Sequence, residues 1–175
     1  ALPIFSAVDY VLIHNIMSGN TNGTFAPEKA LTRAELVTLL WSKEGKPEAA
    51  SDASFNDVAD SDWFAAKVKW AAAAGIVSGY TDGSFKPNKQ VSRQELAQMI
   101  FAYAKYKNVD VSASGSLAGF SDSNAAGGWA RPALQWAVGA GILSGSNGRL
   151  MPANSAKRCE VASMFMRFVE NFKLN

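Results

Sequence analysis

The stretch of sequence that decides the fold reads Gly79-Tyr80-Thr81-Asp82-Gly83-Ser84-Phe85-Lys86-Pro87, and Arg93-Gln94-Glu95 follows it six residues later. An earlier copy occupies residues 19–27 and 33–35, and a third copy, shorter by one loop residue, occupies residues 145–152 and 158–160. A repeat of about 60 residues indicates one supersecondary unit used three times, and such units bury their apolar faces against one another. Three equivalent surfaces favour multivalent binding over a single catalytic centre.

Length and composition exclude several classes of protein. The chain has 175 residues, of which 48% are hydrophobic, so it can bury the core of one compact domain. A formal net charge of +2 is too small to indicate a nucleic-acid partner. The best apolar run, 70–77, is about half as long as a membrane-spanning helix, so we expect no membrane insertion. No segment resembles an export signal, and we expect any such signal to have been removed or to lie outside this sequence.

The single cysteine and the single histidine argue against metal and nucleophilic sites. Cys159 has no disulfide partner, and we interpret it as a small buried residue beside the apolar face of a helix. His14 has no cysteine or histidine at metal-ligand spacing, and we interpret it as a polar residue that closes a helix. The loops 20–23 and 80–83 have too few carboxylates for calcium. We therefore expect no metal and no cofactor.

A cluster of aspartates leaves one enzymatic activity, glycoside hydrolysis, to be considered. Asp57, Asp60 and Asp62 lie close together in the sequence, and glycoside hydrolysis uses a pair of carboxyl groups. They stand where a linker meets a helix, and capping is the ordinary role of aspartate at such a junction. The sequence therefore favours a protein that is not an enzyme.

Each unit is expected to contain a first helix with the same stop signal. In the second copy, the alanine-rich stretch 64–74 has apolar residues at helical spacing and ends at Gly75. The matching residues are Asn15 and Gly141, and an isoleucine follows each of the three stops. Glycine and asparagine accept the left-handed conformation after a helix, and an apolar residue one place later is the usual companion contact.

A second helix is expected to begin at a capping box. Thr32-Arg33-Ala34-Glu35 and Ser92-Arg93-Gln94-Glu95 place a glutamate three residues after a hydroxyl, which closes two open backbone donors at a helix start. We therefore interpret Glu35, Glu95 and Glu160 as capping groups rather than as acids or bases. In the third copy Lys157 replaces the hydroxyl residue, which predicts a helix start that is weaker by about 1 kcal/mol.

Small, polar linkers near 45–54 and 108–119 divide the chain into the units 1–47, 48–110 and 111–175, which together form one compact domain. The second and third units open with a Phe-x-Asp segment that leads to Trp63 and Trp129. This opening is missing before Tyr10, so we expect the first unit to be incomplete at its N-terminal side.

Arginine occupies the first position of all three second helices, at Arg33, Arg93 and Arg158. The position is electrostatically unfavourable, because free N–H groups already make a helix start positive. Such a start with an added guanidinium predicts a receptor for a carboxylate or phosphate. The alternative is an internal salt bridge, for example to Asp57 or Asp122.

The tryptophans divide into two sets. Trp63 and Trp129 precede the first helices, near the loops, where a tryptophan either packs in the core or offers a flat platform for a sugar ring. Trp70, Trp136 and Tyr10 share one helical position and are predicted to be core residues.

These motifs, taken in order, resemble the S-layer homology (SLH) repeat. The segments Phe-x-Asp-Val…Trp, Ala-Gly-Ile-Val-Ser-Gly-Tyr-x-Asp-Gly-x-Phe-x-Pro and Ser-Arg-x-Glu recur at fixed spacing, and Thr32-Arg33-Ala34-Glu35 matches the family's helix start letter for letter. The resemblance extends from about Tyr10 to Phe172. It implies a mainly α fold: three tandem helix-loop-helix repeats that form a pseudo-threefold, three-pronged spindle around a central three-helix bundle.

The resemblance also implies a function. SLH members are parts of exported, extracellular proteins, some with further domains, and hold them non-covalently at the bacterial cell wall. The implied ligand is secondary cell wall polysaccharide with acidic pyruvate ketals, bound in grooves between the prongs. By resemblance, Arg33 and Arg93 would bind the ketal carboxylate together with nearby backbone amides. The sugar and the rest of the grooves would be contacted by Trp63, Trp129, Asp57, Asp122, Ser78, Gly79, Ser144 and Gly145.

Two departures from the family pattern affect the predicted site. The helix start around Arg158 is degenerate, so the third groove is expected to be weak or purely structural. The missing opening of the first unit affects the groove that it would help to build. A different reading of the whole chain is a structural module that packs against other proteins in a surface lattice.

Overall fold

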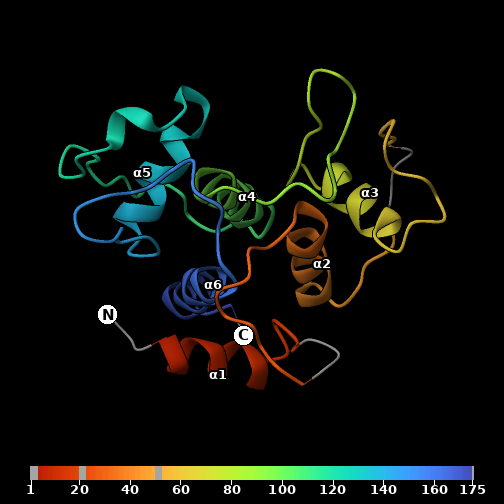
Figure 1. The fold of residues 1–175 in the computed structure, drawn as a ribbon, viewed down its shortest axis with the longest axis horizontal. Helices are drawn as coiled ribbons and strands as arrows, with labels where there is room; N and C mark the ends of the chain where they lie inside the picture. The colour runs from red at the N-terminus through yellow and green to blue at the C-terminus, as the bar shows by residue number, and fades with distance from the viewer. Residues whose placement is uncertain (1–3, 20–22, 50–52, 175) are drawn as a thin grey trace.

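The computed structural model describes residues 4–19, 23–49 and 53–174. Within these ranges the chain is mainly helical, as predicted, and contains no β-strand (Figure 1). Two short 3-10 helices, Ser123–Ala125 and Gly128–Ala130, precede the first helix of the third unit. The six α-helices are α1 (Ile4–Ile13), α2 (Arg33–Lys43), α3 (Ala65–Ala73), α4 (Arg93–Tyr106), α5 (Arg131–Gly139) and α6 (Arg158–Phe172).

The stops of the first helices have the predicted geometry. Asn15, Gly75 and Gly141 have φ values of 52°, 68° and 70°, in the left-handed region. The isoleucine that follows each stop is buried. Its amide donates back to a carbonyl in the last turn of the helix, for example from Ile76 N to Ala71 O at 2.9 Å. A glycine or asparagine in the left-handed conformation and the apolar residue after it therefore end all three helices in the same way.

The capping boxes at the starts of α2 and α4 are also confirmed. The amide of Glu95 donates to Ser92 Oγ at 3.3 Å, and the amide of Ser92 donates to Glu95 Oε2 at 2.8 Å. Thr32 and Glu35 make the same pair of bonds at the start of α2. At the start of α6, Lys157 keeps only half of the box, because its amide donates to Glu160 Oε2 but its ammonium group cannot accept a bond.

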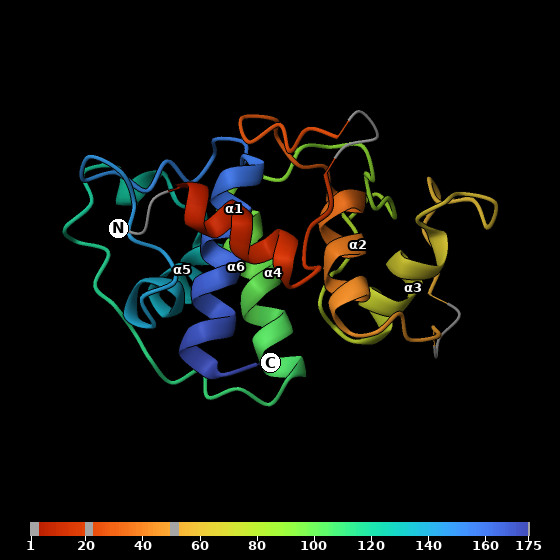
Figure 2. The same ribbon diagram turned by 90° about the horizontal axis from the view of Figure 1, so that it is seen from below.

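The helices pack in pairs that cross the boundaries between units. Helix α3 of the second unit packs on α2 of the first, and α5 of the third unit packs on α4 of the second (Figure 1). Helix α1 packs on α6, which joins the first unit to the last and closes a ring (Figure 2). Each pair therefore consists of the second helix of one unit and the first helix of the next, so no unit completes its own core.

Backbone hydrogen bonds close the same ring at the centre of the molecule. Leu31 N donates to Ala156 O, Ala156 N donates to Val91 O, and Val91 N donates back to Leu31 O, at distances between 2.7 and 3.1 Å. Each of these residues precedes one of the second helices. The cycle contains one residue from each unit, which is the pattern expected of a pseudo-threefold arrangement. The three-pronged spindle shape itself remains a prediction.

Equivalent apolar residues of the second helices are fully buried. Leu36, Leu96 and Val161 lie three residues after the arginines and have no exposed surface. Towards the other ends of the helices, the ring of Tyr103 on α4 packs against Phe165 and Phe168 on α6. The predicted core residues Trp70 and Trp136 are buried, and Tyr10 is half-buried.

Replacing Lys157 with threonine is expected to restore the missing half of the capping box at the start of α6. The substitution removes the exposed ion pair between Lys157 and Glu28, which contributes little. We expect the free energy of unfolding to rise by about 0.5 kcal/mol, measured by urea denaturation. The matched variant Thr32→Ala should lower it by about 1 kcal/mol. Equal stability of Lys157→Thr and the parent chain would contradict this account of the cap.

Candidate functional site: grooves between successive units

Three buried arginines join each unit to the next. The Nε atom of Arg33 donates to Phe85 O of the second unit at 2.8 Å. The same bond, also at 2.8 Å, runs from Arg93 to Leu150 O and from Arg158 to Phe25 O. Because each acceptor belongs to the loop of the following unit, the three bonds repeat the cyclic order of the helix pairs.

The helix starts are not open anion sites, which corrects the prediction from sequence. The amides of the first two residues of α4 donate to Asn154 O and Pro152 O of the third unit, at 2.9 and 3.0 Å. The starts of α2 and α6 are closed in the same way by carbonyls of the following unit. A ligand that binds near these helices would therefore meet the guanidinium groups and not the first backbone amides.

Asp57 and Asp122 hold the loops in place and are not the partners of the arginines. The two carboxylate oxygens of Asp57 accept bonds from Phe85 N at 2.7 Å and from Lys86 N at 2.8 Å. Asp122 accepts the equivalent two bonds in the third unit, from the amides of residues 150 and 151. Burial would raise the pKa of Asp122, but these bonds outweigh it and hold the pKa below its ordinary value. Neither aspartate lines the grooves described below.

One cavity of the described structure is lined by residues of all three units, and we call it the Arg33 groove. Its volume is about 870 Å³. The second unit contributes most of the lining, the first contributes Arg33, and the third contributes Trp129. Of the residues predicted from sequence, Arg33, Ser78, Gly79 and Trp129 come together here. The other polar side chains in the lining are Tyr80, Thr81, Lys89, Ser92, Gln94, Glu95 and Gln98.

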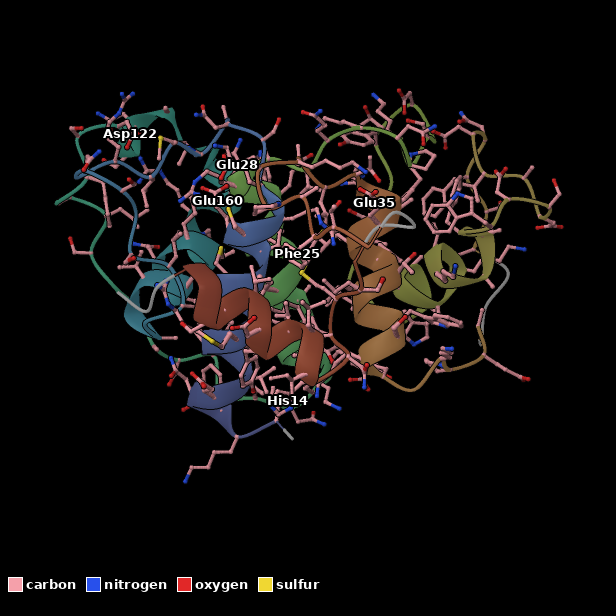
Figure 3. All side chains as sticks on the ribbon, turned by 60° about the horizontal axis from the view of Figure 1, so that its bottom comes forward. His14, Phe25, Glu28, Glu35, Asp122 and Glu160 are labelled. Atoms are coloured by element: carbon pink, nitrogen blue, oxygen red, sulfur yellow. The ribbon has the colours of Figure 1, made fainter. Side chains whose placement is uncertain are left out.

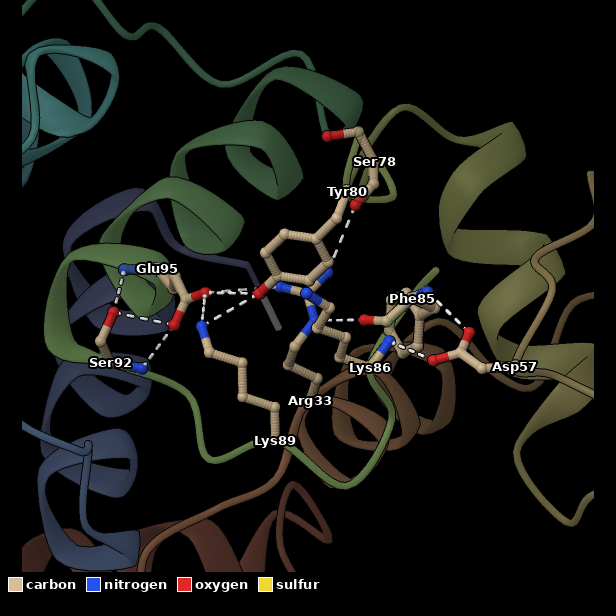
Figure 4. Close-up of polar contacts among 9 residues, drawn as sticks. All are labelled: Arg33, Asp57, Ser78, Tyr80, Phe85, Lys86, Lys89, Ser92 and Glu95. Carbon is tan, nitrogen blue, oxygen red and sulfur yellow. Dashed lines mark hydrogen bonds and ion pairs between the residues drawn. The ribbon is translucent and has the colours of Figure 1, made fainter. Parts of the chain in front are cut away.

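Arg33 lies between two aromatic rings at the base of this groove (Figure 4). Its guanidinium carbon is 5.0 Å from the centre of the Tyr80 ring and 4.6 Å from that of Phe85. Its Nη2 atom donates to Ser78 O at 3.3 Å. The Nη1 atom is 3.8 Å from Glu95 Oε1, which is too far for a hydrogen bond.

Glu95 is the centre of a charged network in the Arg33 groove (Figure 4). Its Oε1 atom accepts from Lys89 Nζ at 2.5 Å and from the Tyr80 hydroxyl at 2.9 Å. Burial alone would raise the pKa of Glu95, but the bonds from Lys89, Ser92 and Tyr80 bring it from 4.5 to about 2. Glu95 is therefore ionised at neutral pH, and with Arg33 and Lys89 it leaves one excess positive charge in the groove.

Trp129 stands at the edge of the Arg33 groove and remains largely exposed. Its side chain is 56% exposed, and that of Trp63 is 60% exposed. Of the two readings of these tryptophans, the structure therefore supports an open aromatic surface over core packing. Gln94 on α4 positions the segment that carries Trp129, because its Oε1 atom accepts from Gly127 N at 2.9 Å.

A smaller cavity of about 230 Å³ occupies the next junction, and we call it the Arg93 groove. It contains the predicted residues Arg93, Ser144 and Gly145, together with Arg167. Here Arg93 Nη1 donates directly to Glu160 Oε1. The equivalent of Trp129 by position in the repeat is Pro3, which lies outside the described residues.

The third junction belongs to Arg158. Arg158 donates to Ser18 O at 2.6 Å and lies 4.6 Å from the centre of the Phe25 ring. Part of the facing loop, residues 20–22, is outside the described ranges. Trp63 lines neither of the two described grooves, and the Lys67 ammonium group lies 4.6 Å from its ring centre.

The residues considered for catalysis or metal binding have ordinary roles. Asp60 pairs with Lys69, and Asp62 accepts from Ala59 N. His14 stands at the end of α1, on the other side of the view from Glu28, Glu35, Glu160 and Asp122 (Figure 3). Cys159 is buried, and burial raises the pKa of its thiol. Among the described residues, no group of His, Cys, Asp and Glu could hold a metal ion.

Several groove residues were missed by the sequence analysis. Gln94 and Gln98 are four residues apart on α4, and that spacing places both on one face of a helix. Lys89 and Lys29 each stand six residues before a capping glutamate, a regularity visible in the repeats. These signals were available, but only the contact between units shows that they face the same cavity as Arg33.

The fold and its grooves define a class of protein: a ring of three helix-loop-helix units that complete one another's cores. The family model described as "S-layer homology domain" matches residues 3–37, 54–97 and 119–162, well over half of the chain. The chain belongs to the S-layer homology domain family. No described helix is long and apolar enough to span a membrane.

Relatives of this chain are much longer proteins. Cell surface glycoprotein 1 of Acetivibrio thermocellus is 30% identical over 167 residues, which cover 91% of this chain and 7% of the relative. The surface-layer 125 kDa protein of Lysinibacillus sphaericus is 31% identical over 94% of this chain and 14% of its own length. A cellulosome-anchoring protein of A. thermocellus is 28% identical over 91% of this chain, which spans 36% of that protein.

Truncation of Arg93 is expected to weaken the junction between the second and third units. Arg93→Ala leaves Leu150 O and Glu160 without their buried donor, so the free energy of unfolding should fall by about 2–3 kcal/mol in chemical denaturation. The control is Arg149→Ala, because Arg149 is exposed and makes only a 3.5 Å contact with Asp122. It should cost less than about 1 kcal/mol. An equal loss of unfolding free energy in the two variants would refute the stabilising role of Arg93 at this junction.

Stability should fall as the pH drops through the range in which Glu95 is protonated. The pKa of Glu95 is about 2 in the fold and 4.5 when unperturbed, so its contribution is complete above about pH 5 and is lost towards pH 2. Glu95→Gln keeps a side chain that can complete the capping box. We expect this variant to show a smaller loss of unfolding free energy between pH 5 and pH 2. An unchanged pH profile would show that Glu95 does not titrate in this way.

Proposed function

We propose that this chain binds acidic cell wall polysaccharide, and thereby anchors an extracellular protein at the bacterial surface without a covalent bond. Membership of the S-layer homology family supports this function, as do relatives whose names describe surface-layer and cellulosome-anchoring proteins. The chain itself would be a binding module, and the catalytic or structural roles of a longer protein would belong to other domains.

The observation that carries the proposal is the Arg33 groove. A cavity of about 870 Å³ has room for a short run of sugar residues rather than a single small ion. One edge presents the exposed face of Trp129, and apolar faces of sugar rings can pack on an indole. The lining adds hydroxyl and amide groups, including Ser78, Gln94 and Gln98, that can exchange hydrogen bonds with sugar hydroxyls.

The charge of the groove favours an acidic glycan. Arg33 and Lys89 supply two positive charges, and the ionised Glu95 cancels one of them. Arg33 Nη1 lies beyond hydrogen-bond distance of Glu95, so this atom can donate to a ligand carboxylate. A pyruvate ketal, which places one carboxylate on a sugar ring, has the matching charge.

Polymeric ligands would make the three junctions act together. Weak binding at two or three grooves on one polysaccharide gives an overall affinity far above that of any single groove. The Arg93 groove is smaller, and its arginine is already paired with Glu160. We therefore assign the main binding role to the Arg33 groove and a minor one to the Arg93 groove.

Calorimetric titration with purified wall polysaccharide tests the proposal, before and after chemical removal of its ketals. We expect saturable binding that is lost with the ketals. Binding that survives their removal would retain the anchor and reject the carboxylate as the recognised group. Absence of binding to both forms would reject the function and favour assembly through protein contacts, for which the exposed Ile13 is a candidate surface residue.

Removing the indole of Trp129 should weaken the binding by about tenfold, which corresponds to about 1.4 kcal/mol. Trp129→Phe keeps a flat aromatic surface and should retain most of the affinity. The control is Trp63→Ala, because Trp63 is equally exposed but does not line the Arg33 groove. A larger loss for Trp63→Ala than for Trp129→Ala would place the binding at a different junction.

A further inference from the structure

Each of the three junctions contains an equivalent capping glutamate, and the partner of its carboxylate differs between the junctions. Each capping glutamate uses Oε2 to accept the amide at the helix start. In the Arg33 and Arg93 grooves the other oxygen, Oε1, lies within ion-pair distance of the arginine of the preceding unit. In the Arg93 groove the Oε1 atom of Glu160 accepts directly from Arg93 Nη1. In the Arg33 groove the Oε1 atom of Glu95 accepts from Lys89 Nζ, and Arg33 Nη1 is 3.8 Å away.

The difference follows one sequence position. The residue four places before each helix-start arginine is Lys29, Lys89 or Asn154 in the three units. Its backbone is equivalent in all three, because its carbonyl accepts the amide of the preceding unit's arginine at 2.9–3.0 Å. Where this residue is lysine, it binds the glutamate: Lys29 Nζ is 3.1 Å from Glu35 Oε1. Where it is asparagine, the arginine binds the glutamate instead.

The Arg158 junction provides an independent comparison. Lys29 is present there, and Arg158 forms no ion pair with Glu35 among the contacts within the described residues. Its guanidinium donates to two carbonyls of the first unit, as Arg33 does in the second. Among the described contacts, the arginine therefore makes no hydrogen bond to the glutamate at either junction with a lysine, although Arg33 stays within ion-pair distance of Glu95, and it does make one at the junction without a lysine.

We propose that Lys89 is a positioning residue for ligand binding, because it occupies Glu95 Oε1 and so keeps Arg33 Nη1 free to bind an anionic group. This inference rests on the proposed function and adds the residue that decides which groove can bind. When a lysine binds the glutamate, the Nη1 atom of the arginine can donate to an anionic ligand. When the arginine itself binds the glutamate, that donor is already used. The Arg93 groove is in the second state.

Crystal structures of two variants without ligand test the distribution of charge directly. In Lys89→Met, we expect Glu95 Oε1 and Arg33 Nη1 to close from 3.8 Å to hydrogen-bond distance. In Asn154→Lys, we expect the introduced lysine to bind Glu160 and Arg93 Nη1 to separate from it. If Glu95 keeps its distance from Arg33 in the first variant, the proposal is overturned, whatever the protein binds.

Titration with the acidic wall polysaccharide then tests the consequence for binding. Lys89→Met should bind about tenfold more weakly, because Arg33 loses its free donor. The double variant Lys89→Met/Glu95→Gln should recover the affinity to within about threefold of the parent chain, because a neutral glutamine no longer captures Arg33. A double variant as weak as Lys89→Met would mean that Lys89 itself contacts the ligand, and would overturn the proposal.

A matched control distinguishes the effect of the position of Lys89 from the effect of the net charge around the groove. Lys86→Met removes one positive charge beside the same Tyr80 ring, which Lys86 Nζ approaches to 4.3 Å, but Lys86 pairs with Asp82 and not with Glu95. It should change the affinity by less than about twofold. A loss equal to that of Lys89→Met would overturn the proposal in favour of simple attraction. If the parent chain does not bind the polysaccharide, the proposed function fails, while the crystal structures still decide the charge distribution.

Discussion

The three junctions depend on a buried guanidinium whose Nε atom donates to a loop carbonyl of the neighbouring unit. A buried charge is costly unless its hydrogen bonds are satisfied, and arginine offers five donors in a rigid fork that can reach several acceptors at once. Its place at a helix start, where the helix dipole opposes a positive charge, is explained by these acceptors. The side chain of each arginine extends from the start of its helix and donates to a loop carbonyl of the next unit. Because the third arginine donates to the first unit, the three units form a closed ring.

The ring makes three copies of one site that differ through single residues. In our proposal, a lysine in place of an asparagine determines whether the arginine of a junction is hydrogen-bonded to the glutamate or lies beyond hydrogen-bond distance of it. Trp129, from the third unit, adds an aromatic edge to the Arg33 groove. The repeat therefore supplies the framework, and we propose that a few residues that differ between the units determine which junction binds a ligand.

Much of the fold could be predicted because it is determined locally. The stop at Gly75 and the capping box of Ser92 and Glu95 require only neighbouring residues, and both are observed as predicted. The expectation that the helix-start amides are open to an anion was wrong, because the carbonyls that close them come from another unit, whereas anion binding by the guanidinium groups stays a proposal. The roles of Asp57 and Lys89 were missed for a different reason: their partners lie in the same unit, but the conformation of the loop that brings them together could not be predicted from local sequence.

The packing of α1 on α6 has a mechanical consequence under the proposed anchoring function. Tension on α6 would be carried to α1, which crosses it (Figures 1 and 2), and to the contact of Arg158, which joins the start of α6 to the first unit. The load then passes around the ring instead of peeling away one unit after another. On this view, separating the units would require several contacts to break together, and a closed ring would resist force better than three units in an open row.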